Sequence, residues 1–187
     1  MQKYNPKWGM GDIIIKNRTG EGVINDEDRT VIGNSIPRFT FGLNLGFEYK
    51  GFDFSCFFQG VGKADGYVTM EAIQPMGING ARKEHYKESF NPQDPKPGAY
   101  FPRILSSDYN YAYMSHWVQD ASYIRLKNLQ IGYSFKIKGL NQLRVYASGE
   151  NLFTATKYRT WDPETPVGAR GFYPNVAVYS MGVNLNF

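Results

Sequence analysis

The chain has 187 residues, 16% of them aromatic and 20 of them glycine, and its formal net charge is +4. Its single cysteine, Cys56, excludes a disulfide within the chain and is expected to be a small apolar residue on a strand. The basic residues are scattered, with no run of five or more, which argues against a nucleic-acid-binding protein. The abundance of aromatic residues and glycine favours strands and tight turns over helices.

Two features of the sequence bear on membrane insertion. No stretch approaches 18 consecutive apolar residues, so no transmembrane helix is predicted. The first residues have no apolar core of a signal peptide, which by itself indicates a cytoplasmic protein if the chain begins at the true N-terminus. A transmembrane β-barrel would pass unnoticed by a hydropathy scan, because its strands alternate in polarity.

The first predicted elements form a loop followed by a hairpin. Residues 1–36 are rich in Gly, Asn, Asp and Pro and are expected to form a loop with short extended pieces. Residues 38–49 and 52–59 alternate with period 2, and Lys50-Gly51 forms a tight turn between them. The first of these strands has one wholly apolar face: Phe39, Phe41, Leu43, Leu45, Phe47 and Tyr49.

A long irregular stretch covers residues 60–112, with turn dipeptides such as Asn91-Pro92 and Asp94-Pro95. A short helix is expected between Ala81 and Phe90. A loop of this length counts against a compact soluble domain, whereas outer-membrane barrels carry long loops on one side.

Three further strands are predicted at residues 117–135, 142–152 and 177–187. Within the first of them the apolar positions change parity, and a β-bulge near Lys127 would bring them back to one face. A short turn at Gly139 joins the first two strands, and a long loop at 153–176 precedes the last.

Five strands with connections that run short, long, short, long fit a transmembrane barrel, which has short periplasmic turns and long extracellular loops. A strand of about 12 residues tilted by ~45° spans roughly 28 Å, close to the thickness of the membrane core. A soluble β-sandwich would show the same alternation, and periodicity does not separate the two. Five strands cannot close a barrel, so this interpretation requires further strands upstream.

Several segments resemble the SusC/RagA-like TonB-dependent receptors. The most specific is Trp117–Leu129, which reads Trp-Val-Gln-Asp-Ala-Ser-Tyr-Ile-Arg-Leu-Lys-Asn-Leu. The resemblance covers most of the chain in order and is weakest at 60–112. The other segments that carry it are Gly20–Asn34 with Ile36–Phe39, Phe41–Leu45 with Tyr49–Asp53 and Gln59-Gly60, Gly132-Tyr133, Leu143–Tyr146 with Gly149–Phe153, and the strand that ends at Phe187.

The resemblance implies an all-β chain that forms about five C-terminal strands of an antiparallel transmembrane barrel of roughly 22 strands in the outer membrane. Residues 1–36 and 60–112 would be extracellular loops. Such receptors are not enzymes; they import glycans, peptides or other large nutrients. They do so with a SusD-like lipoprotein lid and with the TonB system, which would act through an N-terminal region absent from this chain. The alternative is a soluble, secreted, carbohydrate-binding β-sandwich.

Two partners follow from the barrel interpretation. The apolar face of each strand would contact membrane lipid, and the alternating residues that end at Phe187 would be read by the barrel assembly machinery as its signal. An ordinary final strand is the alternative for Phe187.

A metal site is suggested by the spacing of oxygen-bearing side chains in residues 17–28, where Gly22 would supply the sharp turn of a calcium-binding loop. The alternative is a turn-rich loop that keeps this shape without the ion, and no other cofactor is expected. The candidate ligands are Asn17, Thr19, Glu21, Asn25 and Asp28.

Aromatic side chains gather in or beside the predicted extracellular loops. They could stack on sugar rings, or pack against a neighbouring loop or the lid protein. These residues are Tyr109, Tyr111, Tyr113, Trp117, Tyr158 and Trp161.

Catalytic residues are not expected. His85 and His116 lie far apart without a carboxylate at ligand spacing. Asp162 and Glu164 have the chemistry of a glycosidase acid–base pair, but the sequence favours loop residues.

Overall fold

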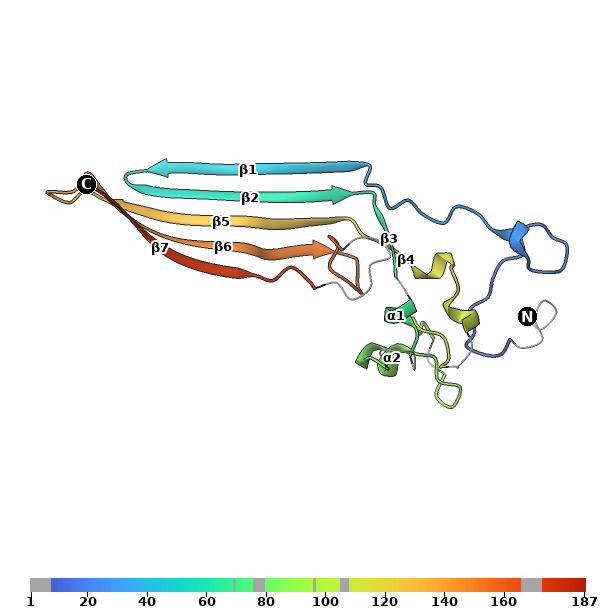
Figure 1. Cartoon of the computed structure of the whole chain (residues 1–187). Helices are drawn as coiled ribbons and strands as arrows, with labels where there is room; N and C mark the ends of the chain where they lie inside the picture. Colours follow the sequence, from blue (N-terminus) through green and yellow to red (C-terminus); the bar gives the residue numbers. More distant parts are fainter. Residues whose placement is uncertain (1–7, 69, 76–79, 96, 105–107, 166–172) are drawn as a thin grey trace. The chain divides into compact units, whose positions relative to one another are not determined.

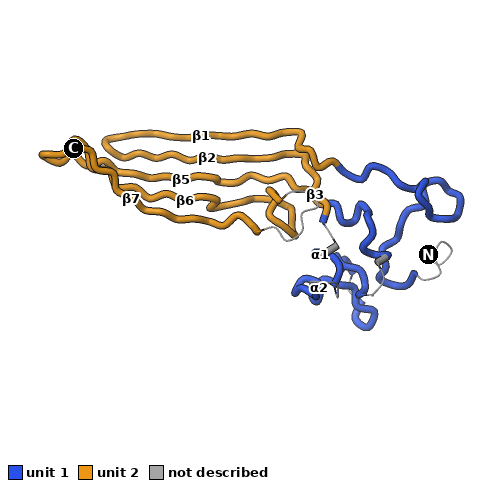
Figure 2. The backbone as a smooth tube through the Cα atoms, in the orientation of Figure 1, with its two compact units in different colours: residues 1–33, 68–118 blue, residues 34–67, 119–187 orange. Residues whose placement is uncertain are grey.

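The computed structural model describes residues 8–68, 70–75, 80–95, 97–104, 108–165 and 173–187. The chain divides into two compact units, coloured separately in Figure 2. The loop unit comprises residues 1–33 and 68–118, and the sheet unit comprises residues 34–67 and 119–187. Parts of the predicted loops, among them 166–172, lie outside the described residues.

The sheet unit is built on one antiparallel sheet in the order β1-β2-β5-β6-β7 (Figure 1). All five predicted strands are confirmed, and two of them extend further than expected, to Gly62 and Thr156. Their bounds are β1 (Phe39–Tyr49), β2 (Phe52–Gly62), β5 (Tyr123–Phe135), β6 (Gln142–Thr156) and β7 (Val178–Asn186).

The strand predicted at 117–135 begins later than expected, at Tyr123, so the predicted start at residue 117 is wrong. A separate three-residue strand, β4 (Val118–Asp120), pairs with β3 (Asp65–Tyr67) and not with the main sheet. The break follows from Asp120, whose side chain accepts a hydrogen bond from the Ser122 amide at 2.9 Å. A side chain that bonds to the backbone two residues later forms a turn in place of the strand ladder.

The predicted bulge near Lys127 is confirmed. Leu126 and Asn128 pair with consecutive residues of β2, so Lys127 is the extra residue on β5. On the other side of β5, the same irregularity skips two residues of β6, Asn151 and Leu152, and Asn151 has a left-handed φ of 52°. The bulge returns Ile124 to the face shared by the apolar residues further along β5.

The sheet therefore has one apolar face, which lies open. Phe39, Leu43 and Phe47 of β1 are 55%, 50% and 54% exposed. Among the described residues no second sheet covers them, so the β-sandwich expected as the alternative is not found. Cys56 is the exception, 7% exposed between Leu45 and Leu129 of the neighbouring strands, in agreement with its predicted apolar role.

The tight turn between β1 and β2 has a sterically required glycine. Lys50 and Gly51 both have left-handed φ values, 49° and 88°, as two-residue hairpins with a type I′ turn demand. A Cβ atom on Gly51 would lie 2.7 Å from the carbonyl oxygen of Ser134, whose amide donates to the Gly51 carbonyl at 2.7 Å. The turn thus packs directly against the end of β5.

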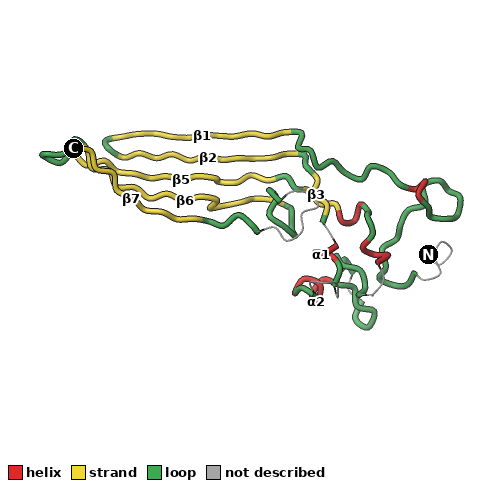
Figure 3. The backbone as a smooth tube through the Cα atoms, viewed as in Figure 1, coloured by secondary structure: helices red, strands yellow, loops and turns green. Residues whose placement is uncertain are grey.

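The loop unit holds short helices joined by extended segments (Figure 3). The helix expected between Ala81 and Phe90 is confirmed as α2 (Lys83–Glu88), and α1 (Met70–Ile73) is a second short helix. Trp117 is fully buried, and its ring packs on that of Tyr111 with 6.2 Å between centroids. Within the described residues, no helix combines the length and apolar character needed to cross a membrane. Single 3-10 turns complete the unit: Asp26–Asp28, Asp108–Tyr111 and Ser115–Trp117.

A buried histidine stabilises the loop unit in its neutral form. His85 is 0% exposed; its Nδ1 accepts from the Arg82 amide at 3.1 Å, and its Nε2 lies 3.0 Å from the Ala72 carbonyl oxygen. Burial lowers the pKa of His85, against an opposing effect of the hydrogen bond to Ala72. Protonation would place a second donor opposite the Arg82 amide and break this arrangement.

We expect the loop unit to lose stability as the pH falls below about 6.5, the value of an unfolded histidine. Stability falls as the pH falls because the pKa of His85 is lowered in the folded unit, which therefore binds a proton less readily than the unfolded unit. Hydrogen exchange at the Ser89 amide, which donates to the His85 carbonyl, should become faster at pH 5 than intrinsic rates predict. His116→Gln, at an exposed ring, should keep this pH dependence, whereas His85→Gln should remove it; a wild-type amide insensitive to pH would contradict the assignment.

Candidate functional site

The polar face of the sheet carries the best-defined side-chain chemistry of the chain. It lies opposite the apolar face, and the alternation of β2, β5 and β6 places their polar residues there. Two groups of ion pairs occur on it, one near the bulge of β5 and one near the short turns. Neither was predicted.

The first group, termed the Arg125 cluster, is centred on a guanidinium that is 2% exposed. Arg125 Nη2 donates to both carboxylate oxygens of Asp162 at 2.8 Å, and its Nε donates to Thr154 Oγ1 at 2.8 Å. Asp162 is itself only 8% exposed. The fork of hydrogen bonds makes this a charge pair of fixed geometry. The cluster comprises Tyr123, Arg125, Lys127, Asp162 and Glu164.

Glu164 completes the cluster with three contacts to β5. Its Oε2 lies 3.0 Å from Arg125 Nη1 and 2.8 Å from Lys127 Nζ, and its Oε1 accepts from Tyr123 Oη at 3.0 Å. Two cations and two carboxylates give a formal charge of zero. Because Asp162 also accepts from the Glu164 amide at 2.9 Å, the whole Asp-Pro-Glu turn is fixed on the polar face of β5.

Asp162 and Glu164 are thus ion-pair partners and not an acid–base pair. Asp162 is bound by Arg125, and Glu164 is bound by Lys127 and Tyr123, whereas a glycosidase leaves its two carboxyl groups free to flank the substrate. The sequence interpretation of these residues as loop residues is consistent with this geometry. Their link to Arg125, 37 residues away in the chain, was missed.

The second group bridges three strands. Arg144 of β6 donates from Nε to Asp53 Oδ1 of β2 at 2.9 Å, and the pair passes over Gly132 of the intervening strand β5. Both side chains are about one-fifth exposed. A Cβ atom on Gly132 would lie 2.5 Å from Asp53 Oδ1 and 2.7 Å from Arg144 Nη2, so only glycine leaves room for the ion pair.

Gly132→Ala is therefore expected to displace the Asp53–Arg144 pair and to destabilise the sheet by about 1–3 kcal/mol, as overpacking does. Gly46→Ala is the matched control. Gly46 belongs to β1 and lies on the same polar face of the sheet as Gly132, but a Cβ atom there would meet only ordinary contacts, the nearest at 3.4 Å. The measurement is the midpoint of urea unfolding of each variant in detergent. Equal midpoints for the two variants would show that the ion pair does not depend on Gly132.

Four of the five predicted calcium ligands, all except Glu21, form hydrogen bonds with one another or with backbone amides of the loop. Asp28 Oδ1 accepts from the amides of Arg18 and Thr19, and Oδ2 accepts from the Asn25 amide at 3.2 Å. The Thr19 amide, followed by those of Arg18 and Asn25, holds the pKa of Asp28 below its usual value, against the effect of burial.

Asn17 and Asn25 behave like Asp28, whereas Glu21 is exposed. Asn17 Oδ1 accepts from the Gly20 amide at 2.5 Å, and Asn25 Oδ1 accepts from the Glu27 amide at 2.9 Å. Among the described residues, no group of three or more His, Cys, Asp or Glu side chains is arranged to hold a metal ion. The side-chain oxygens of Asn17, Asn25 and Asp28 therefore stabilise turns of the loop by accepting hydrogen bonds from backbone amides. This arrangement differs from the ring of oxygen ligands around a calcium ion.

The predicted aromatic residues are divided between the two units. In the loop unit Trp117 and Tyr111 are 0% and 1% exposed, and Tyr109 donates to the Ile13 carbonyl at 3.2 Å. In the sheet unit Tyr158 is 8% exposed and packs on Gly66, and Trp161 is partly buried. The buried rings pack against protein, and contact with a substrate remains a prediction. Phe187, 83% exposed, follows the last residue of β7.

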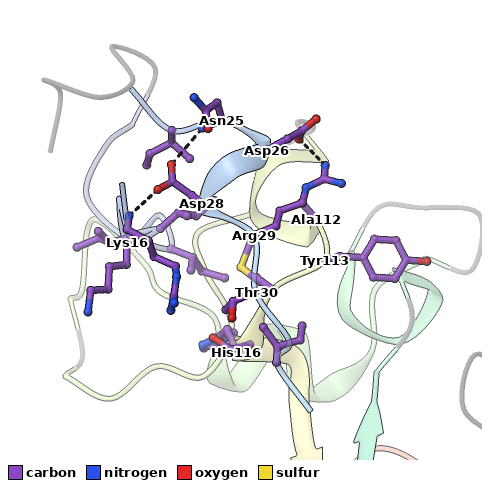
Figure 4. A pocket seen from close by; sticks show the side chains of 17 residues that line it. Lys16, Asn25, Asp26, Asp28, Arg29, Thr30, Ala112, Tyr113 and His116 are labelled. Carbon is purple, nitrogen blue, oxygen red and sulfur yellow. Dashed lines mark hydrogen bonds and ion pairs between the residues drawn. The ribbon is translucent and has the colours of Figure 1, made fainter. Parts of the chain in front are cut away.

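An open pocket of about 980 Å³ lies within the loop unit (Figure 4). Its wall joins residues 13–32 to residues 112–116 and mixes isoleucine side chains with charged ones such as Lys16, Asp28 and Arg29. Sequence reasoning missed it, because its two walls are separated by about 80 residues that include the β1–β2 hairpin. Such a wall suits contact with another molecule and contains no nucleophile paired with a base.

Known proteins resemble this chain over nearly its whole length, although no family model matches it. TonB-dependent receptor P3 of Formosa agariphila is 34% identical over 95% of the chain, and TonB-dependent receptor SusC of Bacteroides thetaiotaomicron is 27% identical over 93%. The chain spans only 19% and 17% of these two relatives.

Solved structures agree on the fold. Two structures of the RagAB peptide importer, in the open-open and closed-closed states, match 83% and 84% of the chain with TM-scores of 0.66 and 0.67. The identity is 24%, and 18% of each solved chain is covered. The open five-stranded sheet is thus a segment of a larger antiparallel barrel.

Proposed function

Because the chain belongs to the family of TonB-dependent receptors, outer-membrane proteins that are not enzymes, we propose that it forms five adjoining strands near the C-terminal end of a nutrient-importing barrel. The single observation that carries this proposal is the open apolar face of the sheet. Side chains that stay half exposed along an entire strand face need an apolar medium, and lipid provides it.

The dimensions of β1 support this assignment. Eleven residues at ~3.3 Å each, tilted by ~45°, span roughly 25 Å along the membrane normal. The apolar band of transmembrane barrels has about this height. The polar face, with the Arg125 cluster and the Asp53–Arg144 pair, would then line the interior.

The edges of the sheet support it as well. β1 and β7 each pair with one neighbour only, and an unpaired edge in lipid costs several kcal/mol for each unsatisfied backbone group. The relatives are about five times longer than the match, so their remaining length can supply the strands that close the barrel.

Substrate and partners form the finer part of the proposal. We propose import of a large nutrient such as a glycan or a peptide, with a SusD-like lipoprotein over the loop unit and energy from the TonB system. The resemblance to SusC and to the RagAB peptide importer supports this choice. We further propose that Phe187 belongs to the signal read by the barrel assembly machinery.

We propose that the loop around Asp28 keeps its shape without calcium, because three backbone amides already donate to the Asp28 carboxylate. Isothermal titration of the full receptor with calcium should give no binding heat. A heat that disappears in the Asp28→Asn variant would reverse this proposal.

The test of the main proposal uses a strain that lacks the full-length receptor. It should lose growth on one nutrient in a panel of glycans and peptides, and the wild-type gene should restore it. The receptor should remain in the outer-membrane fraction after a carbonate wash. Recovery of the protein in the soluble fraction would contradict the proposal.

A further inference from the structure

The short-turn end of the sheet carries lysines without acidic neighbours. Lys50 occupies the turn between β1 and β2, and Lys136 and Lys138 occupy the turn between β5 and β6. Residues 49–52 and 135–142 contain these three lysines and no Asp or Glu, a charge of +3 in a chain whose net charge is +4. All three side chains are exposed, and no ion pair involves them among the described residues.

The two turns lie side by side at the same end of the sheet (Figure 1). The Ser134 amide at the end of β5 donates to the Gly51 carbonyl at 2.7 Å, which joins the first turn to the second hairpin. The side-chain carboxylates that follow or precede the first turn, Glu48 and Asp53, belong to the polar face, where Asp53 is already paired with Arg144. Beside the second turn, the Asn141 amide donates to the Asn186 carbonyl at 2.9 Å, so the main-chain carboxylate of Phe187 lies at this end of the sheet and offsets one of the three charges. The lysines therefore form one basic row.

This row borders the apolar face. The ammonium of Lys50 lies 5.2 Å from the centroid of the Tyr49 ring, which places the cation on the side that would meet lipid. Tyr133 and Phe135, in edge contact at 4.7 Å between centroids, continue the aromatic rim on β5. They are 43% and 44% exposed, and Tyr49 is 66% exposed. An aromatic rim followed by lysines is the pattern of residues at the head-group level of a bilayer.

We propose that Lys50, Lys136 and Lys138 bind the phosphate groups of anionic phospholipids in the leaflet that faces the short turns. The proposal rests on the proposed membrane-spanning role of the sheet. Three neighbouring ammonium groups that outnumber the carboxylates at this end of the sheet attract phosphate, and the aromatic rim holds them at the depth where phosphates lie. The lipid is recognised by the charge of its head group and not by its acyl chains.

The test reconstitutes the full-length receptor in vesicles of equal parts phosphatidylcholine and phosphatidylglycerol and counts the lipids retained in native mass spectra. The wild type should retain phosphatidylglycerol at least about fivefold over phosphatidylcholine. The triple variant K50Q/K136Q/K138Q should retain both equally. The control K16Q/K83Q/K87Q removes the same charge from exposed lysines of the loop unit and should keep the preference.

Two further results separate the possible failures. Transfer of the wild type to 1 M salt should abolish the preference for phosphatidylglycerol, because salt screens the lysine charges. This measurement tests the proposal without a mutation and so remains valid if the triple variant does not fold. Equal retention of both lipids by the wild type, or an unchanged preference in the triple variant, would overturn the proposal. A receptor that retains neither lipid and does not insert into vesicles would instead overturn the membrane-spanning role.

Discussion

Arg125→Ala is expected to destabilise the sheet unit by about 3–5 kcal/mol, the cost of leaving buried carboxylates without their cation. Asp162, 8% exposed, would lose both of its 2.8 Å hydrogen bonds from the guanidinium. Glu164 would keep Lys127 and Tyr123, so the Asp-Pro-Glu turn should detach at Asp162 first. The segment that precedes this turn would then become mobile.

Limited proteolysis measures this release. Trypsin cleaves after Lys157 and Arg159, which are exposed and lie just before the turn. Cleavage there should be at least tenfold faster in Arg125→Ala than in the wild type. Arg125→Lys should fall between them, because a single ammonium nitrogen cannot replace the three guanidinium nitrogens that contact Thr154, Asp162 and Glu164. If trypsin cleaved Arg125→Ala no faster than the wild type, the Arg125 cluster would not be what holds the segment before the Asp-Pro-Glu turn in place.

The second large effect is expected from a charge placed on the apolar face. Leu43 lies near the middle of β1, 50% exposed. If this face meets lipid, Leu43→Arg should cost about 2–4 kcal/mol, the depth-dependent penalty for a charged side chain at the centre of a bilayer. The amount of folded receptor in the outer membrane, seen as the heat-modifiable band on a gel, should fall by at least tenfold.

The adjacent residue provides the control for this substitution. Asn44 lies on the polar face of the same strand, so Asn44→Arg adds the same side chain one position away and should leave most of the folded band intact. Equal loss in both variants would indicate a general effect on β1. Equal tolerance would mean that Leu43 does not face hydrocarbon.

Much of the sheet could be predicted because its determinants are local. Alternating polarity marks each strand, and the parity change between Leu126 and Leu129 locates the bulge at Lys127, where the structure has it. The short turns follow from local residue types in the same way, as Lys50-Gly51 illustrates. The break after β4 was missed, because it depends on one hydrogen bond from Ser122 to Asp120.

The polar clusters could not be predicted as readily, because they depend on contacts between distant residues. Arg125 and Lys127 alternate along β5, and Asp162 and Glu164 show the same spacing in a loop 37 residues away. Matching spacing of opposite charges was the signal available, but nothing in the sequence states that the loop folds onto the polar face. The core of the loop unit around Trp117 escaped prediction for the same reason, since its packing joins irregular segments.

The account depends most on which medium surrounds the apolar face, and spin-label accessibility measures this directly. Labels are attached at Leu43→Cys and Asn44→Cys in a Cys56→Ser background of the full receptor in vesicles. The label at position 43 should be relaxed strongly by oxygen, which concentrates in hydrocarbon, and weakly by a water-soluble nickel chelate; position 44 should show the lower oxygen effect. A label at position 43 shielded from both agents would place this face between packed protein layers and contradict the account.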